Sequence, residues 1–591
     1  MPRAAPDAAS LALGRQRLIV ALCWLASACV MLALNWARYP GLDFRDPDEA
    51  MRLAQVRDFL AGQSWFDVSQ HRVNPPIGGP MHWSRIVDLP IAGLILLLRP
   101  LLGNDWAERI ACIAVPLILS GALFAALVPA ARRIGGPFLA LVSAVLLALS
   151  LTILIQFQPL RIDHHNWQIL MAAIVLGAAF DPRALRGGLV AALGTAIWLH
   201  VSSEGLPYAA MFGGLFALRY LRDAAAWPRL AAYLGGLAAL SALVLLGTHG
   251  WAASLQTHCD AISPPFLIPM IAAALAVPLG RRTIGDTIPI RRCATLVIGG
   301  GCALAAFLLF GRDCLSGPFE TLDPLVYRYW YLQVLEGRPI WEQSPAMAGM
   351  IVAGSLPGVI GALAAAWRAP DRAARIRWLE LALLIVGSFA IALMVMRAMS
   401  VAHLFALPGA AWLVLALFGK AQRAASPLVR IPGSLAACLL TPIGLGCLWM
   451  AFIPATPADA TKPQADCTST RALAPLVGLP ATTIFAPIDL GPDILQRTPH
   501  AVIGTAHHRN VAGIGLVIRG FMDAPATAKG VVGSTRATLL LLCPGAVEIA
   551  NYAKVRPNGL AAQLLRGRAP DWLIPVPLPA TSGYRLYRVR R

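Results

Sequence analysis

A long series of apolar segments limits what this chain can fold into more than any other feature. The first runs from about Leu18 to Leu34 and follows Arg3, Arg15 and Arg17. Twelve more centre near residues 119, 147, 173, 194, 212, 238, 272, 302, 355, 388, 410 and 443. A helix needs about 20 predominantly apolar residues to cross a bilayer. The sequence therefore predicts a mostly α-helical, polytopic membrane protein with about 13 transmembrane helices.

Composition agrees with that class of protein. Of the 591 residues, 57% are apolar and 13% are charged, whereas an ordinary soluble domain has about 25% charged residues. These values exclude a single soluble domain, a disordered chain and a small disulfide-rich protein. The net charge is +19. We interpret the basic excess as an orientation signal, because Lys and Arg collect on the cytoplasmic side of a membrane protein; no nucleic-acid partner is expected.

One apolar segment, Leu89 to Leu102, is too short to span and contains Arg99 and Pro100. If it does not cross, 21 basic residues fall in the N-terminus and cytoplasmic loops, against five in the short loops opposite. If it crosses, this bias is inverted. The sequence thus predicts an interfacial or re-entrant helix there and a cytoplasmic N-terminus.

This topology places four regions on the outer face: residues 37–107, a short loop around Asp163, residues 311–344 and the tail 455–591. We expect a transmembrane domain over 1–454 and a periplasmic C-terminal α/β domain over 455–591, because the tail has short β-like runs and turn signals. The expected location is a bacterial inner membrane, with contacts to membrane lipids.

Four cysteines lie on this outer side. In an oxidising compartment Cys467 and Cys543 are expected to form a disulfide, and Cys259 and Cys314 offer a second, weaker pairing.

Two acidic clusters lie on the outer face. Residues 43–49 carry four carboxylates, including Asp46 and Asp48, and residues 161–167 read Arg-Ile-Asp-His-His-Asn-Trp, including Asp163 and His165. Carboxylates and a neutral imidazole suit Mg²⁺ or Mn²⁺. Taken singly, each cluster is also explained by a solvated turn with helix caps. Because the charge argument puts both on one face, a metal site is the better interpretation.

Two further groups belong to the outer face. Glu336 lies in an aromatic-rich loop, and Arg397 lies at the outer end of the eleventh span. A lone Arg at this depth either extends towards the interface or binds a pyrophosphate, for which a guanidinium is well shaped. His200, Ser203 and Glu204 form a weaker cluster that we attribute to hydrogen bonding between helices.

In the order and side of these motifs, the chain resembles the GT-C membrane glycosyltransferases. It is most similar to the catalytic subunit of oligosaccharyltransferase and its bacterial and archaeal relatives. The resemblance implies a polyprenyl-linked sugar donor, inversion at the anomeric carbon and a divalent metal. The Asp-Pro-Asp-Glu stretch at 46–49 matches the catalytic motif of the family's first loop, best at Asp48 and next at Asp46. Asp163 and His165 match an archaeal Asp-His-His motif.

The same resemblance assigns roles to single residues. It implies Asp48, Asp163 and His165 as metal ligands, and Asp46, Asp48 or Glu336 as the acidic group that orients or deprotonates the acceptor. On the donor side it implies the residues Arg397, His164 and Arg52.

The tail departs from the family. Oligosaccharyltransferases carry a Trp-Trp-Asp motif there, whereas the comparable region here reads Ala-Pro-Ile-Asp-Leu-Gly-Pro over 486–492. The acceptor (a glycan, a lipid or a protein) is therefore unassigned. His507 and His508 follow further on, in what we interpret as a polar loop, with metal or acceptor binding as the alternative.

Other functions are compatible with the chain. Transfer of an oligosaccharide en bloc to protein, a polysaccharide polymerase and a lipid-linked glycan transporter remain alternatives. A transporter predicts charges buried in the middle of spans, whereas here they gather at the outer ends.

Overall fold

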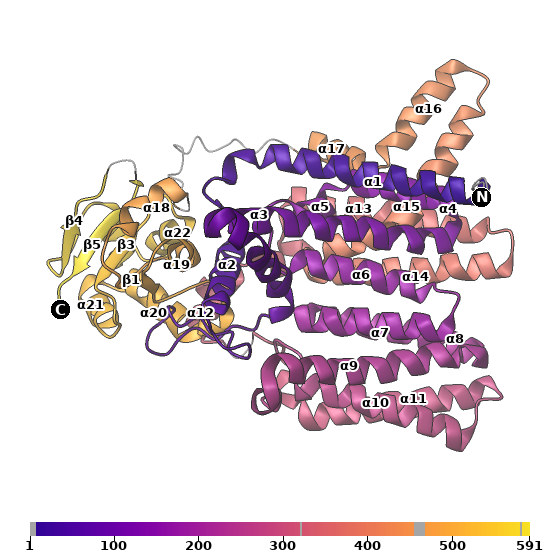
Figure 1. Cartoon of the computed structure of the whole chain (residues 1–591), viewed down its shortest axis with the longest axis horizontal. Coiled ribbons are helices and arrows are strands. Elements are labelled where there is room, and N and C mark those ends of the chain that lie inside the picture. The colour runs from indigo at the N-terminus through magenta and orange to yellow at the C-terminus, as the bar shows by residue number, and fades with distance from the viewer. Residues whose placement is uncertain (1–7, 320–321, 454–466, 468, 580–581) are drawn as a thin grey trace.

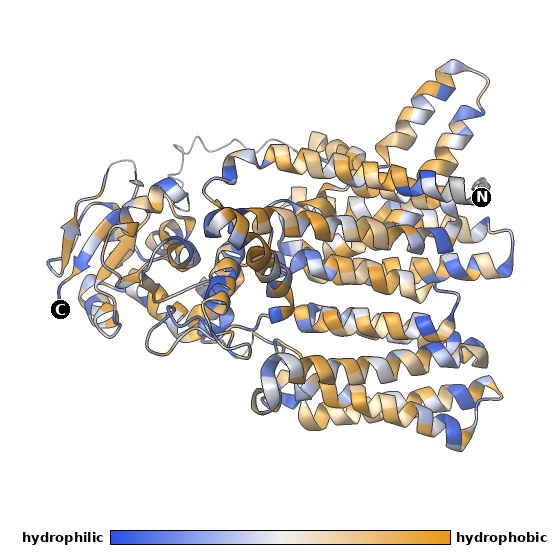
Figure 2. Ribbon diagram, in the orientation of Figure 1, coloured by the Kyte–Doolittle hydropathy of each residue, from blue (hydrophilic) through white to orange (hydrophobic). Residues whose placement is uncertain are grey.

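A computed structural model describes residues 8–319, 322–453, 467, 469–579 and 582–591. The expected domain boundary at 454/455 lies outside these residues. A bundle of long, roughly parallel helices forms one part of the molecule, and a smaller α/β domain lies against one end of it (Figure 1). Hydrophobic residues cover the long helices, and the loops at the far end of the bundle carry hydrophilic ones (Figure 2).

Each apolar run of the sequence corresponds to a helix or a bent pair of helices. The bundle consists of α1 (Ala8–Leu34), α3 (Arg85–Gly135), α4 (Pro137–Ala148), α5 (Leu151–Leu154), α6 (His165–Ala179), α7 (Ala184–Val201), α8 (Leu206–Arg222), α9 (Trp227–Ser254), α10 (Pro264–Ile284), α11 (Pro289–Phe310), α13 (Pro345–Trp367), α14 (Arg372–Met394), α15 (Met399–Gln422), α16 (Pro427–Leu439) and α17 (Pro442–Phe452). Within the described ranges, nine helices are long and apolar enough to span, or up to 11 if two bent pairs each count as one. The number 13 stays a prediction.

The segment expected at the membrane interface is the first part of α3. The helix breaks at Gly103, where φ is 75° and ψ is 169°, a conformation that glycine adopts without steric cost. Before the break, Leu97 is 68% and Leu101 80% exposed. An exposed apolar face on a short helix is typical of a segment that lies on a bilayer.

Glycines allow two bundle helices to approach closely. A Cβ at Gly361 of α13 would lie 1.9 Å from the carbonyl oxygen of Gly409 in α15, and one at Gly409 would lie 2.1 Å from that of Gly358. Small residues at a helix crossing are typical of membrane bundles, because close backbone contact provides packing energy that lipid cannot.

The C-terminal domain contains the predicted sheet. Its five strands run in the order β2 (Ala501–Val502), β1 (Thr483–Phe485), β3 (Leu539–Leu542), β5 (Arg585–Val589), β4 (Leu573–Val576). β1 pairs in parallel with β2 and β3, and β5 pairs antiparallel with β3 and β4. The helices of the domain are α18 (Thr470–Val477), α19 (Gly491–Arg497), α20 (Val511–Met522), α21 (Pro525–Gly533), α22 (Val547–Val555) and α23 (Leu560–Leu565).

Segments from elsewhere in the chain complete this domain. Val73 of the first loop forms a parallel bridge with Val502 at the β2 edge. Trp83 of the same loop is buried in one hydrophobic cluster with Leu473 of α18. Val326 of α12 (Pro324–Tyr329) is fully buried in a second cluster with residues of α20. The first loop, α12 and the tail therefore share two hydrophobic cores.

Both expected disulfides form. Cys259 is bonded to Cys314 with a Cα–Cα distance of 5.1 Å, and Cys467 is bonded to Cys543 with a distance of 6.2 Å. The first joins the α9–α10 loop to the loop after α11, and the second joins the start of the tail to the end of β3.

Candidate active site

A cavity of about 850 Å³ lies between the C-terminal domain and the ends of the bundle helices next to it. Its lining comes from the first loop and the tail, from the loops before α6, after α7 and between α9 and α10, from residues 318–319 and residues within 329–337, and from the turn between α14 and α15. The charged and imidazole side chains of its wall are those of Arg45, Asp46, Asp48, His82, His164, His200, Glu204, Asp260, Glu336, Arg397, Asp489, Asp493, His507, His508 and Glu548. Five of the residues predicted from the sequence thus face one space: Asp46, Asp48, His164, Glu336 and Arg397.

The first acidic motif forms the start of α2 (Pro47–Leu60). Asp46 is the N-cap: its Oδ1 accepts a hydrogen bond from the Asp48 N–H at 3.1 Å, and Glu49 Oε2 accepts one from the Asp46 N–H at 3.0 Å. This capping box explains why the helix begins here. It also directs the Asp48 side chain, which is 25% exposed, into the cavity.

Asp48 faces the C-terminal domain. Its Oδ1 lies 3.4 Å from His507 Nε2. Burial works to raise the pKa of Asp48, but His507 lowers it to about 2, so this carboxylate is ionised at neutral pH. An ionised, cavity-facing carboxylate is suited to bind a cation.

The two acidic motifs meet at Arg161. Its guanidinium contacts Glu49 at 2.7 Å, Asp163 at 3.1 Å and Asp46 at 3.3 Å. Burial works to raise the pKa of Asp163, but the charge of Arg161 and contact with His165 hold it well below the usual range. The predicted closeness of the two motifs is therefore observed, with Arg161 between them.

Two buried imidazole nitrogens lie next to the second acidic motif. Asp163 Oδ2 lies 2.7 Å from His165 Nδ1, which leaves His165 Nε2 on the opposite side of the ring. His165 Nε2 and His164 Nδ1 are buried without a hydrogen-bond partner. A buried nitrogen without a partner is costly unless it binds something. These nitrogens are of a donor type that metals take, but the ligand atoms of Asp48, Asp163 and His165 do not all lie within 4.8 Å of one another.

Arg397 is held by two carboxylates. It forms ion pairs with Glu204 and, at 3.3 Å, with Glu336 Oε1. The predicted residues Glu336 and Arg397 are thus neighbours, and Glu204, which we assigned to helix contacts, belongs to the same cluster. All three side chains are about one quarter to one third exposed and line the cavity.

Arg52 does not reach this cavity. Its side chain is fully buried, its Nη1 donates to Asp88 Oδ1 at 2.9 Å, and its guanidinium lies 4.2 Å above the Trp83 ring. Asp88 also accepts from Gln55 at 2.8 Å and from Arg85 at 3.2 Å. The expectation that Arg52 binds the donor is therefore wrong: the residue anchors α2 to α3.

Four residues of the cavity wall were not predicted from the sequence to have a role at the site: His82, Asp260, Asp489 and Glu548. Asp260 stands alone in the sequence, and His82 lies in a first-loop stretch, residues 76–88, that resembles the family's loop but was given no role. Asp489 and Glu548 form an acidic pair in the tail, where the backbone N–H groups of Ile488 and Asp489 donate to the Glu548 carboxylate at 3.0 and 3.2 Å. Burial, followed by the charge of Asp489, raises the pKa of Glu548 to about 8.

Comparison with known proteins identifies the fold. No family model and no curated protein matches the sequence. The fold is similar to that of solved oligosaccharyltransferase structures, as the resemblance implied.

Among the solved structures that match are several of an archaeal oligosaccharyltransferase. The apo oligosaccharyltransferase of Archaeoglobus fulgidus matches with a TM-score of 0.63 and 14% identity, over 90% of this chain and 69% of that one. The oligosaccharyltransferase AglB of the same organism, in complex with an inhibitory peptide and a dolichol-phosphate, matches with a TM-score of 0.64 and 13% identity, over 94% and 72%. A complex of the A. fulgidus enzyme with Zn and sulfate gives 0.60 and 13%, over 92% and 70%.

Proposed function

We propose that this protein is a metal-dependent glycosyltransferase that uses a polyprenyl-phosphate- or diphosphate-linked sugar at the outer, periplasmic face of a bacterial inner membrane. The observation that carries the proposal is the 850 Å³ cavity, where Asp48, His164, Glu336 and Arg397 face one space at the outer ends of membrane helices. The GT-C fold supports it, because the archaeal structures with this fold are oligosaccharyltransferases.

The charge and position of each residue indicate a different role in the reaction. Arg397 leaves its ion pair with Glu336 or Glu204 when the donor binds. Its guanidinium then binds the phosphate of the donor. Asp48, Asp163 and His165 would hold Mg²⁺ or Mn²⁺. When bound, such an ion supplies Lewis-acid neutralisation of the departing phosphate. Asp46, Asp48 or Glu336 would orient or deprotonate the acceptor hydroxyl or amide.

The acceptor is left open in this proposal. The A. fulgidus enzyme has been crystallised with a tethered acceptor peptide that contains an NVT sequon. The Trp-Trp-Asp motif that resemblance leads us to expect in the tail is absent from the sequence. We therefore propose transfer of a sugar from the lipid carrier without assigning a protein acceptor.

An assay with purified full-length protein tests the function. Polyprenyl-linked sugars with a labelled glycan are supplied with and without Mn²⁺, and transfer to candidate acceptors is followed by chromatography. Asp48→Asn is expected to lower turnover at least about 100-fold, as loss of a group that acts on the reacting centre does. Arg397→Gln is expected to raise the KM for the donor.

The matched control is Glu342→Gln. Glu342 lies six residues after Glu336 in the same loop, pairs with Arg338 and does not line the cavity. This variant should keep wild-type turnover. Wild-type turnover in Asp48→Asn would refute the proposed site, and failure of every lipid-linked sugar to react would refute the proposed function.

A further inference from the structure

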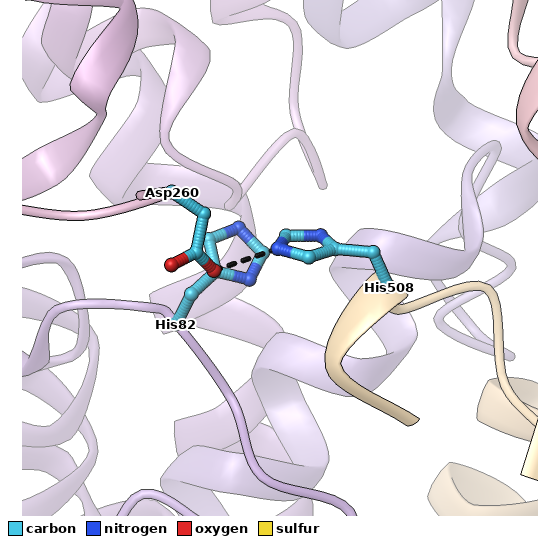
Figure 3. Close-up of side chains that lie close together, drawn as sticks. All are labelled: His82, Asp260 and His508. Carbon is cyan, nitrogen blue, oxygen red and sulfur yellow. Dashed lines mark hydrogen bonds and ion pairs between the residues drawn. The ribbon is translucent and has the colours of Figure 1, made fainter. Parts of the chain in front are cut away.

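A second cluster of ligand-type side chains lies in another part of the cavity wall. His82 comes from the first loop, Asp260 from the loop between α9 and α10, and His508 from the short helical turn His508–Asn510 of the C-terminal domain. One ligand atom of each lies within 4.8 Å of the other two. In the described part of the chain, this is the one group of three or more His, Cys, Asp or Glu residues that meets such a limit. Figure 3 shows both rings and the carboxylate turned towards a common point.

The geometry of the cluster is that of an incomplete coordination shell. His508 Nε2 lies 2.7 Å from Asp260 Oδ2, and the His82 and His508 rings are 4.4 Å apart between centroids. His82 Nδ1 is buried and has no hydrogen-bond partner. Two imidazoles this close repel each other once both are protonated, whereas neutral imidazoles bind a metal ion together.

Surrounding groups hold the carboxylate in place. Arg509 donates to Asp260 through Nε at 2.7 Å and Nη2 at 2.8 Å, and through Nη1 to the carbonyl oxygen of Met81 at 3.1 Å. The adjacent Cys259 is disulfide-bonded to Cys314, which fixes the backbone next to Asp260. Outer contacts that orient a ligand in this way are a regular part of metal sites.

We propose that His82, Asp260 and His508 bind a divalent transition-metal ion, for which zinc fits best. Two imidazole nitrogens and one carboxylate oxygen are the donor types that zinc takes, and three protein ligands leave a fourth position open. All three residues line the cavity. A metal at His508 Nε2 would take the place of the contact with Asp260 Oδ2, and the single proton of the neutral ring would then reside on Nδ1.

This site is distinct from the proposed one at Asp48, Asp163 and His165 and does not depend on glycosyl transfer. Its ligands belong to three segments far apart in the sequence. A bound ion therefore fastens the first loop and the α9–α10 loop to the C-terminal domain. Metal bound to the folded protein stabilises it by mass action.

Metal content of the full-length protein in detergent tests the site. The protein is stripped with a chelator, loaded with Zn²⁺, passed over a desalting column and measured by mass spectrometry of the metal. Wild-type protein and Asp48→Asn are both expected to retain a zinc equivalent that His82→Gln and His508→Gln lose. Arg509→Gln is expected to weaken zinc binding about 10- to 100-fold, as loss of an orienting group does.

The matched control is His71→Gln. His71 lies in the same loop as His82, but it is largely exposed and pairs with Asp67, so this variant should bind zinc as the wild type does. Co²⁺ titration of the wild-type protein gives a second readout that does not depend on variants folding. Visible absorption of a four-coordinate Co²⁺ ion is expected, and Zn²⁺ should abolish it.

Two results would overturn the proposal. One is wild-type protein that retains no zinc and shows no Co²⁺ absorption. The other is a zinc equivalent that His82→Gln and His508→Gln keep but Asp48→Asn loses, which would support the first metal site and exclude this one. A protein that retains this zinc ion but transfers no sugar would contradict the proposed function and leave the zinc site supported.

Discussion

Asp88 allows a sharp test of what holds the first loop to the bundle. Its carboxylate is 1% exposed and accepts three hydrogen bonds, from Arg52 at 2.9 Å, Gln55 at 2.8 Å and Arg85 at 3.2 Å. Asp88→Asn keeps the size of the side chain but removes its charge. Two buried guanidinium groups then lose their counter-ion.

The expected cost follows from these contacts. A hydrogen bond to a charged group contributes about 1.5–3 kcal/mol, so three could amount to about 5–9 kcal/mol if they were independent. They share one desolvated carboxylate and are not independent. Removing one partner of a buried ion pair costs about 3–5 kcal/mol, and we expect this lower range for Asp88→Asn.

Chemical denaturation in detergent micelles, followed by Trp fluorescence, measures the change in unfolding free energy. Glu342→Gln, which removes an exposed ion pair with Arg338, is the control and should change stability by about 0–1 kcal/mol. A loss below about 1 kcal/mol for Asp88→Asn would refute the reasoning, because it would mean that the buried cations find other partners or solvent.

Three further predictions concern packing, the disulfides and a titrating acid. Gly361→Ala should destabilise the protein by about 1–3 kcal/mol, since the added methyl group meets the α15 backbone, whereas Gly300→Ala, with open space around it, should be neutral or stabilising in the same denaturation experiment. Replacing Cys259 and Cys314 together by Ala should cost about 2–4 kcal/mol, measured against the wild type with its disulfides intact. Burial raises the pKa of Glu548 to about 8 from an ordinary 4.5, so the folded state keeps a proton that the unfolded chain loses. Stability should therefore fall as the pH rises from about 5 to 8, and Glu548→Gln should flatten this dependence in denaturation curves recorded across that range.

Local patterns in the sequence predicted much of the fold. Each apolar run became a helix or a bent pair because the signal for such a helix is contained within its own residues. The tail was recognised as an α/β domain from its β-like runs, since Leu539–Leu542 is apolar throughout, as a buried strand is. The disulfide partners followed from the side of the membrane on which the sequence predicts each cysteine to lie.

Contacts between distant segments were beyond the reach of the sequence. Arg52 lies four residues after Asp48, and a motif comparison placed both in the active site. Only the fold shows that the guanidinium turns to Asp88, on another helix. His82, Asp260 and His508 likewise come together from positions that share no local pattern, so no spacing rule finds them.

The shared hydrophobic cores have a consequence for the order in which this protein is made. Trp83 emerges early in synthesis, but Leu473, which packs in the same cluster, follows 390 residues later. At roughly 5–20 residues per second, this interval lasts roughly 20–80 s. Throughout that time the apolar side of the first loop has no partner from the tail. A nascent chain stalled or truncated before residue 470 would present this surface, and quality-control proteases or chaperones at the membrane could recognise it.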